Sequence, residues 1–274
     1  MIIMEMLSYG FMQRALVGGS LIAILCSVLG VFLVLRRLSL IGDGLAHVTF
    51  GSVALALLFR LQSVYLTLAI IPVVLASSMG ILKLAQKARI YGDAAIGIVS
   101  AIGIATGVML ASVAGGFNVD LFSYLFGNIL SISTSELVIA ALLFVIVIAC
   151  VVMFYNELFA STFDEDLAKS SGIDTERINS VLVLMTALTV VLAMKVVGIM
   201  LISALLILPA VSALQIAKGF KSAIITAAVI GVVTVICGIS LSFVMNLPSG
   251  ATIVLMNFAV LLGAFGGRTL RGHK

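Results

Sequence analysis

Residues 222–245 read SAIITAAVIGVVTVICGISLSFVM, a run that contains no charged side chain. About 20 such residues form a helix long enough to cross roughly 30 Å of membrane hydrocarbon. Comparable runs recur along the whole chain, in which 63% of residues are hydrophobic and only 9% are charged. Since a backbone in lipid must satisfy its hydrogen bonds internally, these runs are expected to be helices. The sequence therefore predicts an all-α, polytopic transmembrane helical bundle that forms a single domain over residues 1–274.

The apolar runs indicate about eight or nine membrane helices. We expect them near residues 11–35, 40–59, 64–85, 94–114, 135–155, 178–194, 197–216, 222–245 and 251–265. The second is the weakest span, because Gly42, Asp43, Gly44 and His47 lie at its start. We expect this helix to be broken or tilted near Asp43 and to line a cavity.

The basic residues lie at the ends of the apolar runs and not in one patch, which argues against a nucleic-acid partner and indicates a role in orienting helices. If all nine segments cross and the N-terminus lies outside, every Lys and Arg except Arg14, Arg60 and Lys195 falls in the cytoplasm. If the second segment re-enters instead, the N-terminus moves inside. Both arrangements place the C-terminus in the cytoplasm.

Asp43 and His47 are the most informative polar residues of the chain. They stand four positions apart, about one helical turn, so their side chains are expected on the same helix face. A carboxylate and an imidazole suit a divalent transition metal, and ionisable groups within a membrane mark transport routes. Two protein ligands rarely complete a coordination shell, so a second copy of the chain, another helix or water would supply the rest.

Two other interpretations of this pair stay open. In the first, Asp43 caps the start of a helix and His47 is an interior polar residue with its hydrogen bonds satisfied. In the second, the same two side chains relay protons.

The longest polar stretch, residues 156–177, is expected to carry a short helix on the cytoplasmic side. Thr162 or Asp164 would cap its start, acidic residues follow in its first turn, and Gly172 would end it. These start and stop signals predict a helix that stands apart from the membrane spans.

The short helix has a small apolar face formed by Phe163, Leu167 and Ala168, with charged residues around it. Such a face suits docking against a soluble partner, and the alternative is a solvated loop helix. On the outer side, residues 115–128 are aromatic and interrupted by Gly. This segment is expected either to re-enter the membrane and cap the pathway or to form an aromatic belt that anchors a loop.

Pro209 is expected to kink the helix near residues 197–216, because it removes a backbone hydrogen bond. Ser203 and Ser212 lie nearby and could satisfy the polar groups that this kink frees. Small residues on the same run, such as Gly198 and Ala210, would allow close packing against a neighbouring helix.

The chain contains no Gly-x-x-x-x-Gly-Lys-Ser/Thr phosphate loop, so it cannot bind ATP by that route. It also contains no His-Glu-x-x-His or Gly-x-Ser-x-Gly motif, and it has no large polar region in which to assemble a catalytic centre. The sequence is therefore not that of an enzyme, and its energy source is expected to be a partner or an ion gradient.

Three stretches, residues 35–47, 120–127 and 197–213, resemble the permease subunits of bacterial ABC-3 family metal importers of the zinc and manganese type. The resemblance implies a homodimer in the bacterial plasma membrane, a separate cytoplasmic ATPase that uses the ATP, and an extracytoplasmic metal-binding protein that delivers the ion. Asp43 and His47 match the metal-pathway pair of this family. The residues Phe163, Asp164, Leu167, Ala168 and Gly172 match its coupling segment.

Under this resemblance the chain holds no permanent cofactor, and the transported ion is Zn²⁺ or Mn²⁺. The local sequence resembles the zinc branch more than the manganese branch, although an imidazole and a carboxylate accommodate either ion. A proton-coupled secondary carrier of metal cations is the alternative from another class. Such carriers commonly contain internal repeats with paired broken helices, and no second copy of the Gly-Asp-Gly-Leu-Ala-His pattern occurs in this sequence.

Overall fold

The computed structural model describes residues 8–59, 63–87, 91–113 and 132–271, and within these ranges it contains helices and no strand. The helices are α2 (Gly10–Leu35), α3 (Ile41–Leu58), α4 (Ser63–Lys87), α5 (Gly92–Val113), α7 (Thr134–Met153), α8 (Tyr155–Phe163), α9 (Glu165–Ser170), α10 (Thr175–Val197), α11 (Ile199–Ile216), α12 (Phe220–Met245) and α13 (Ser249–Arg271). The expected all-α membrane bundle is confirmed.

Seven of the described helices are long and apolar enough to cross a membrane, and the apolar parts of α4 and α11 are slightly shorter. This agrees with the expected eight or nine spans. The start of α10 lies before the predicted position, because Asp174 caps it by accepting a hydrogen bond from the Arg177 amide at 3.1 Å. The break expected near Asp43 is not present: α3 runs without interruption from Ile41 to Leu58.

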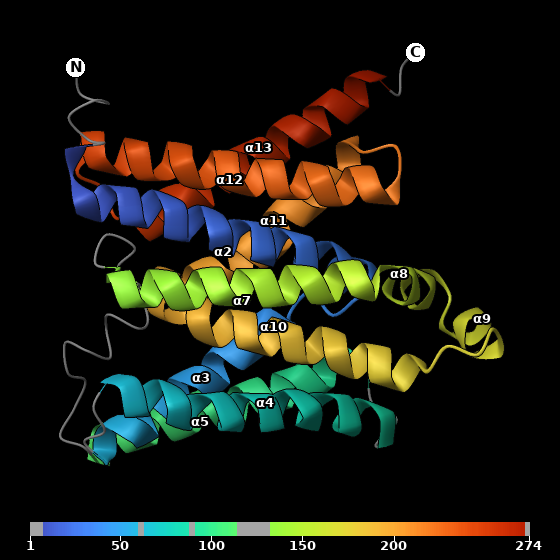
Figure 1. The fold of residues 1–274 in the computed structure, drawn as a ribbon, viewed down its shortest axis with the longest axis horizontal. Helices are drawn as coiled ribbons and strands as arrows, with labels where there is room; N and C mark the ends of the chain where they lie inside the picture. Colours follow the sequence, from blue (N-terminus) through green and yellow to red (C-terminus); the bar gives the residue numbers. More distant parts are fainter. Residues whose placement is uncertain (1–7, 60–62, 88–90, 114–131, 272–274) are drawn as a thin grey trace.

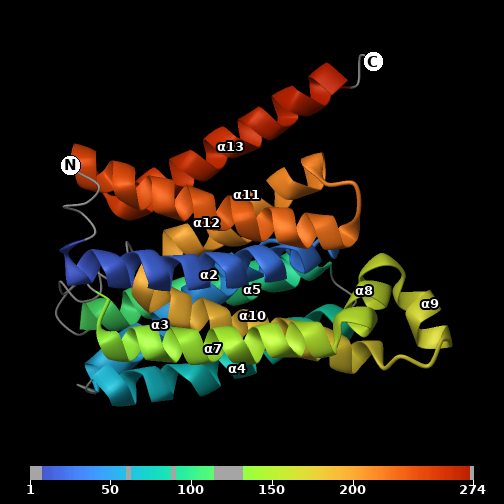
Figure 2. The same ribbon diagram turned by 45° about the horizontal axis from the view of Figure 1, so that its top comes forward.

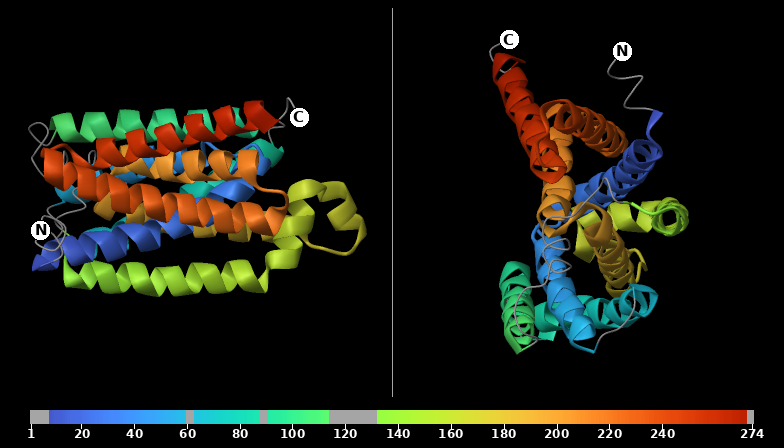
Figure 3. Two further views of the ribbon diagram at one scale, coloured as in Figure 1. Left: turned by 90° about the horizontal axis from the view of Figure 1, so that it is seen from above. Right: turned by 90° about the vertical axis from the view of Figure 1, so that its left-hand side faces the viewer.

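The long helices lie side by side along one axis, and the short α8 and α9 project from one end of the bundle (Figures 1 and 2). Helix α2 begins at the opposite end, whereas α13 ends on the same side as α9 (Figure 3). In the most apolar stretch of α2, and likewise in that of α3, 72% of the residues are buried, against 22% in α7 and in α13. Helices α2 and α3 therefore belong to the interior, and α7 and α13 leave most of their apolar surface for lipid.

Helix α3 packs most extensively against α5, and glycines allow the two backbones to touch. A Cβ atom on Gly51 would lie 2.6 Å from the carbonyl oxygen of Gly103. A Cβ atom on Gly103 would lie 2.8 Å from the amide nitrogen of Val48 and 2.9 Å from the carbonyl group of His47. Gly103 and Gly107 are one turn apart, the spacing with which small residues bring membrane helices into close contact.

Two further glycines fix the first turn of α3 between its neighbours. Gly42 leaves no room for a side chain beside Leu206 of α11, and a Cβ atom on Gly44 would lie 2.7 Å from a methyl group of Ile96 on α5. The backbone at the start of α3 therefore packs directly against a side chain of α11 on one side and a side chain of α5 on the other.

We expect Gly103→Ala to destabilise the bundle by about 1–3 kcal/mol, because the new methyl group meets backbone atoms of α3 that cannot move independently. Unfolding by a denaturing detergent, followed by circular dichroism, measures this change. Gly97→Ala on the same helix is the control, since nothing lies within 4 Å of its Cβ position. Equal stability of the two variants would contradict the close packing of α3 and α5.

Candidate functional site

Asp43 and His47 face each other in the first two turns of α3. Asp43 Oδ2 lies 3.5 Å from His47 Nε2, and the two side chains are 46% and 24% exposed. The Ser203 hydroxyl of α11 donates a hydrogen bond to Asp43 Oδ1 at 3.2 Å. One carboxylate oxygen is thus oriented from a neighbouring helix, while the other points toward the imidazole.

The short connection before α3 determines where this pair lies. Arg37 adopts a left-handed conformation with φ of 58°, and the Leu38 amide donates to the Leu33 carbonyl at 2.9 Å. This bonding closes the last turn of α2 in the manner of a Schellman motif. The chain then enters α3 at Ile41, so the Asp43 carboxylate lies near the positive end of the helix dipole.

The capping interpretation of Asp43 does not describe the hydrogen bonds of the structure. The N-cap residue of α3 is Leu40, which has no side-chain capping bond. Among the described residues, the Asp43 carboxylate contacts Ser203 and His47. A polar role that involves the space between α3 and α11 is therefore favoured over a local cap.

The pair is incomplete as a metal site within the residues that the structure describes. No group of three or more His, Cys, Asp or Glu residues gathers there at a spacing that could hold an ion. Asp43 and His47 offer one oxygen and one nitrogen donor, and a tetrahedral or octahedral ion needs at least two more. The expected sources of these ligands are still a second copy of the chain, another helix or water.

The second candidate site is the short helix at the end of the bundle. Asp164 caps α9 by accepting a hydrogen bond from the Leu167 amide at 2.9 Å. At the other end, Gly172 takes φ of 86°, and the Ile173 amide donates to the Ala168 carbonyl at 3.0 Å. The predicted start and stop are confirmed, with Asp164 and not Thr162 as the cap.

The apolar face of this segment differs from the prediction at one position. Leu167 is 64% exposed and Phe163 is 61% exposed, whereas Ala168 is only 2% exposed. Ala168 follows Leu167 by one position on the helix, so its side chain lies on a different face and points inward. The prediction that Ala168 belongs to the exposed apolar face is therefore wrong. Phe163 is the last residue of α8, where its ring packs against Phe159 and edge-on against Phe220, with centroids 4.9 and 5.6 Å apart.

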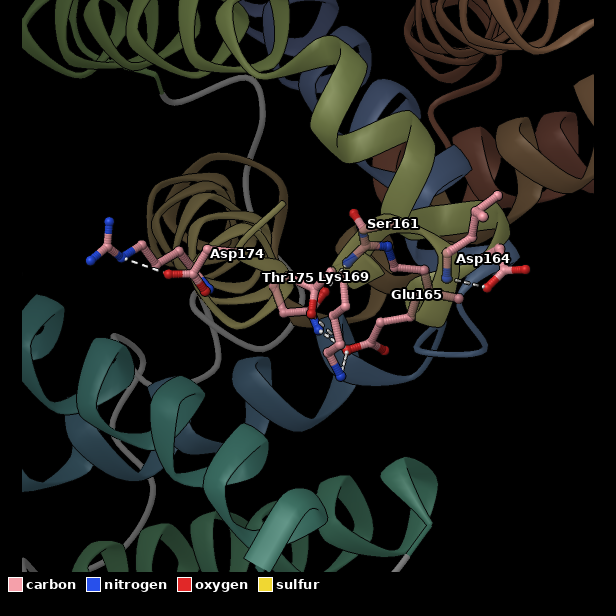
Figure 4. A network of polar contacts seen from close by, with 10 residues as sticks. Ser161, Asp164, Glu165, Lys169, Asp174 and Thr175 are labelled. Atoms are coloured by element: carbon pink, nitrogen blue, oxygen red, sulfur yellow. Dashed lines mark hydrogen bonds and ion pairs between the residues drawn. The ribbon is translucent and has the colours of Figure 1, made fainter. Parts of the chain in front are cut away.

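Glu165 ties α9 to the start of α10. Its Oε1 atom accepts hydrogen bonds from Thr175 Oγ1 at 3.2 Å and Asn179 Nδ2 at 3.4 Å, and it lies 3.1 Å from Lys169 Nζ (Figure 4). The hydrogen bond and charge of Glu165 raise the pKa of Lys169. These contacts give a short exposed helix a fixed orientation on the bundle.

Arg36 connects the end of α2 to the same region. Its guanidinium donates to Thr162 Oγ1 at 2.9 Å, Ser161 Oγ at 2.5 Å and the Leu158 carbonyl at 3.3 Å, all on α8, and to Asn179 Oδ1 on α10. Burial lowers the pKa of Arg36 to about 10, while the nearby charge of Glu165 acts to raise it. The side chain therefore stays protonated at neutral pH.

The predicted proximity of Asp43 and His47 is present in the structure, and their role as metal ligands stays a prediction. The contacts of Ser203 and Arg36 were not predicted. Ser203 was expected to satisfy backbone groups near Pro209, yet it reaches the carboxylate of another helix. Arg36 was expected only to orient a helix end. Residues 115–128, with the expected outer segment, lie outside the described residues.

Comparison with known proteins agrees with the fold and with the resemblance of the motifs. The profile of the ABC 3 transport family matches residues 8–267. The chain is 34% identical over 261 residues to the manganese transport system membrane protein MntC of Halalkalibacterium halodurans, covering 95% of this chain and 88% of that protein. It is 30% identical over 252 residues to the high-affinity zinc uptake system membrane protein ZnuB of Haemophilus influenzae, covering 92% and 95%. The structure resembles that of PsaBC from Streptococcus pneumoniae in complex with Fab, with a TM-score of 0.85, 31% identity and coverage of 96% of this chain and 94% of that chain.

Proposed function

We propose that this chain, which belongs to the ABC 3 transport family, forms the path by which a divalent transition-metal ion crosses the membrane in an ATP-driven importer. The chain is a multi-pass helical membrane subunit of a transporter and not an enzyme. The proposal rests above all on the approach of Asp43 Oδ2 to His47 Nε2, 3.5 Å apart on a helix with no other ionisable side chain. Such a pair in a membrane protein has a high desolvation cost, which a role in ion passage explains.

We propose Zn²⁺ as the first candidate for the transported ion. If two copies of the chain meet about a symmetry axis beside the half-exposed Asp43 side chain, they contribute two imidazole nitrogens and two carboxylate oxygens. Four such ligands match the tetrahedral shell that Zn²⁺ adopts. The hydrogen bond from Ser203 to Oδ1 supports this proposal, since it leaves Oδ2, which faces His47 Nε2, to bind the ion.

Mn²⁺ is the second candidate, favoured by the 34% identity to a manganese transport protein. This ion prefers an octahedral shell rich in oxygen, which the same four protein ligands would fill with two waters. Uptake of each ion in competition with the other distinguishes the two candidates.

The partners follow from the same proposal. The exposed Leu167 and Phe163 side chains would dock on a cytoplasmic ATPase, and an extracytoplasmic metal-binding protein would deliver the ion to the other end of the bundle. Docking at α9 is supported by two exposed apolar side chains on a segment that Glu165 and Asp164 hold in place. Membership of an ABC transport family weighs against the proton-coupled carrier, which would need no ATPase.

The proposed orientation puts α9 and the end of α13 in the cytoplasm of a bacterial plasma membrane, with the start of α2 outside. Two observations support it. The ends of α2 and α13 that carry Arg36 and Arg271 lie on the same side as α9 (Figure 1), and clustered cationic residues mark the cytoplasmic side of membrane proteins.

We predict that Asp43→Ala and His47→Ala each abolish metal uptake while leaving membrane insertion intact. Each removes a direct ligand, and even the loss of a residue that only supports a ligand typically lowers metal affinity or activity about 10–100-fold. The measurement is uptake of radioactive zinc and manganese by proteoliposomes that contain the permease with its ATPase. Transport at the normal rate in both variants would refute the metal path.

A graded comparison within α11 serves as the control. Ser203→Ala removes only the hydrogen bond to Asp43 and should weaken uptake less than Asp43→Ala does. Ser212→Ala on the same helix removes a buried hydroxyl that has no hydrogen-bond partner within the described residues, and it should leave uptake unchanged.

We predict that Leu167→Asp prevents the ATPase from binding or uncouples ATP hydrolysis from transport. A carboxylate in the centre of an apolar contact carries a desolvation cost of several kcal/mol, about enough to dissociate a protein complex of moderate affinity. Co-purification with the ATPase and uptake per ATP hydrolysed measure the effect. Leu167→Met, which keeps an apolar side chain of similar size, should behave as the wild type; normal coupling in Leu167→Asp would contradict docking at this face.

We predict that a reporter protein that works only in the cytoplasm is active when it is fused after Lys274. The same reporter inserted after Gly172 should give the same result, because α9 and the end of α13 lie on one side of the bundle. An alkaline phosphatase fusion, active outside the cytoplasm, checks the opposite case. Strong phosphatase activity at the C-terminus would invert the proposed topology and remove the docking role of α9.

A further inference from the structure

The guanidinium of Arg36 joins the end of α2 to two other helices. It donates to three acceptors on α8 and one on α10, so all three of its nitrogens are used. All four acceptors are uncharged, although the cation is largely buried. Arginine suits such a position because its planar fork presents several donors in fixed directions.

Asn179 extends this bonding to α9. Its Oδ1 atom accepts from Arg36, and its Nδ2 group donates to Glu165 Oε1 at 3.4 Å. The two neighbours fix the orientation of the amide, because one can only donate and the other can only accept. A continuous series of hydrogen bonds therefore runs from α9 through Asn179 to the end of α2.

The same arginine is also close to the metal pair along the chain. Arg36 is the C-cap residue of α2, and Asp43 follows seven positions later in the first turn of α3. Backbone bonds fill the connection: Leu38 donates to Leu33 at 2.9 Å, Ile41 to Leu38 at 3.0 Å, and Gly44 to Leu40 at 3.0 Å. Because this connection has little slack, a shift of Arg36 would move the first turn of α3.

We propose that Arg36 is the positioning residue that couples the position of α9 to the geometry of Asp43 and His47. The inference rests on the proposed function, in which α9 binds the ATPase and the pair binds the ion. When the ATPase moves α8 and α9, the three bonds of Arg36 to α8 and the path from Glu165 through Asn179 carry that displacement to the end of α2. The α2–α3 connection passes this displacement to Asp43. The hydrogen bond of Asp43 to Ser203 comes from a separate helix, α11.

Arg36→Lys tests this role because it keeps the positive charge but replaces four directed hydrogen bonds with a flexible ammonium group. The neighbouring Arg37→Lys is the matched control, since Arg37 is exposed and lies in the same turn. Wild type and both variants are reconstituted with the ATPase in proteoliposomes. The readouts are zinc uptake, ATP hydrolysed per ion transported, equilibrium zinc binding and co-purification of the ATPase.

Arg36→Lys should lower uptake roughly tenfold and raise the ATP used per ion by a similar factor, within the 5–150-fold range typical of coupling between sites. Zinc binding and ATPase co-purification should stay within about twofold of the wild type, and Arg37→Lys should match the wild type throughout. Asn179→Ala breaks the series of hydrogen bonds from α9 to Arg36 but keeps the bonds of Arg36 to α8, so it should show the same changes in weaker form. It replaces Arg36→Lys as the test variant if Arg36→Lys does not assemble.

Normal coupling in Arg36→Lys, or in Asn179→Ala where it is the variant that assembles, would overturn the inference alone. Loss of zinc binding and ATPase binding together in both variants would also overturn it, since Arg36 would then be a structural anchor only. Failure of the wild type to transport metal with ATP would instead refute the proposed function, and this inference with it.

Discussion

The contact of α3 with α5 and α11 is the interaction on which the rest of the structure depends. Glycines bring the backbones together at Gly51 and Gly103, and Gly42 fits beneath Leu206. In lipid no hydrophobic force drives two apolar helices together, so close van der Waals packing of small residues has to hold them. This packing keeps a helix with two ionisable side chains in the interior of the bundle.

The position of α3 in the bundle determines the polar contacts of its first turn. Its backbone is fixed against Ile96 on one side, and Ser203 of α11 reaches the Asp43 carboxylate on the other. His47 lies one turn further on the same face. At the end of the bundle, Arg36 and Glu165 join α2, α8, α9 and α10 through hydrogen bonds, so that the exposed segment is not independent of the interior.

Much of this could be predicted from local sequence. Runs such as residues 222–245 determine membrane helices by length and polarity alone, and the Asp164 cap and Gly172 stop depend only on neighbouring residues. Contacts between distant segments could not be predicted in this way. Ser203 lies 160 positions from Asp43, and Arg36 lies 143 from Asn179; one sequence gives no signal for such pairs. The burial of Ala168 and the continuity of α3 depend in the same way on packing against the rest of the bundle.

The zinc X-ray absorption spectrum of the reconstituted permease would show whether Asp43 and His47 hold the ion in transit. We expect one zinc ion per two chains, with nitrogen and oxygen ligands at about 2.0–2.2 Å and no sulfur ligand. The Asp43→Ala, His47→Ala double variant should lack this spectrum. A sulfur ligand at about 2.3 Å, or an unchanged spectrum in the double variant, would contradict the claim.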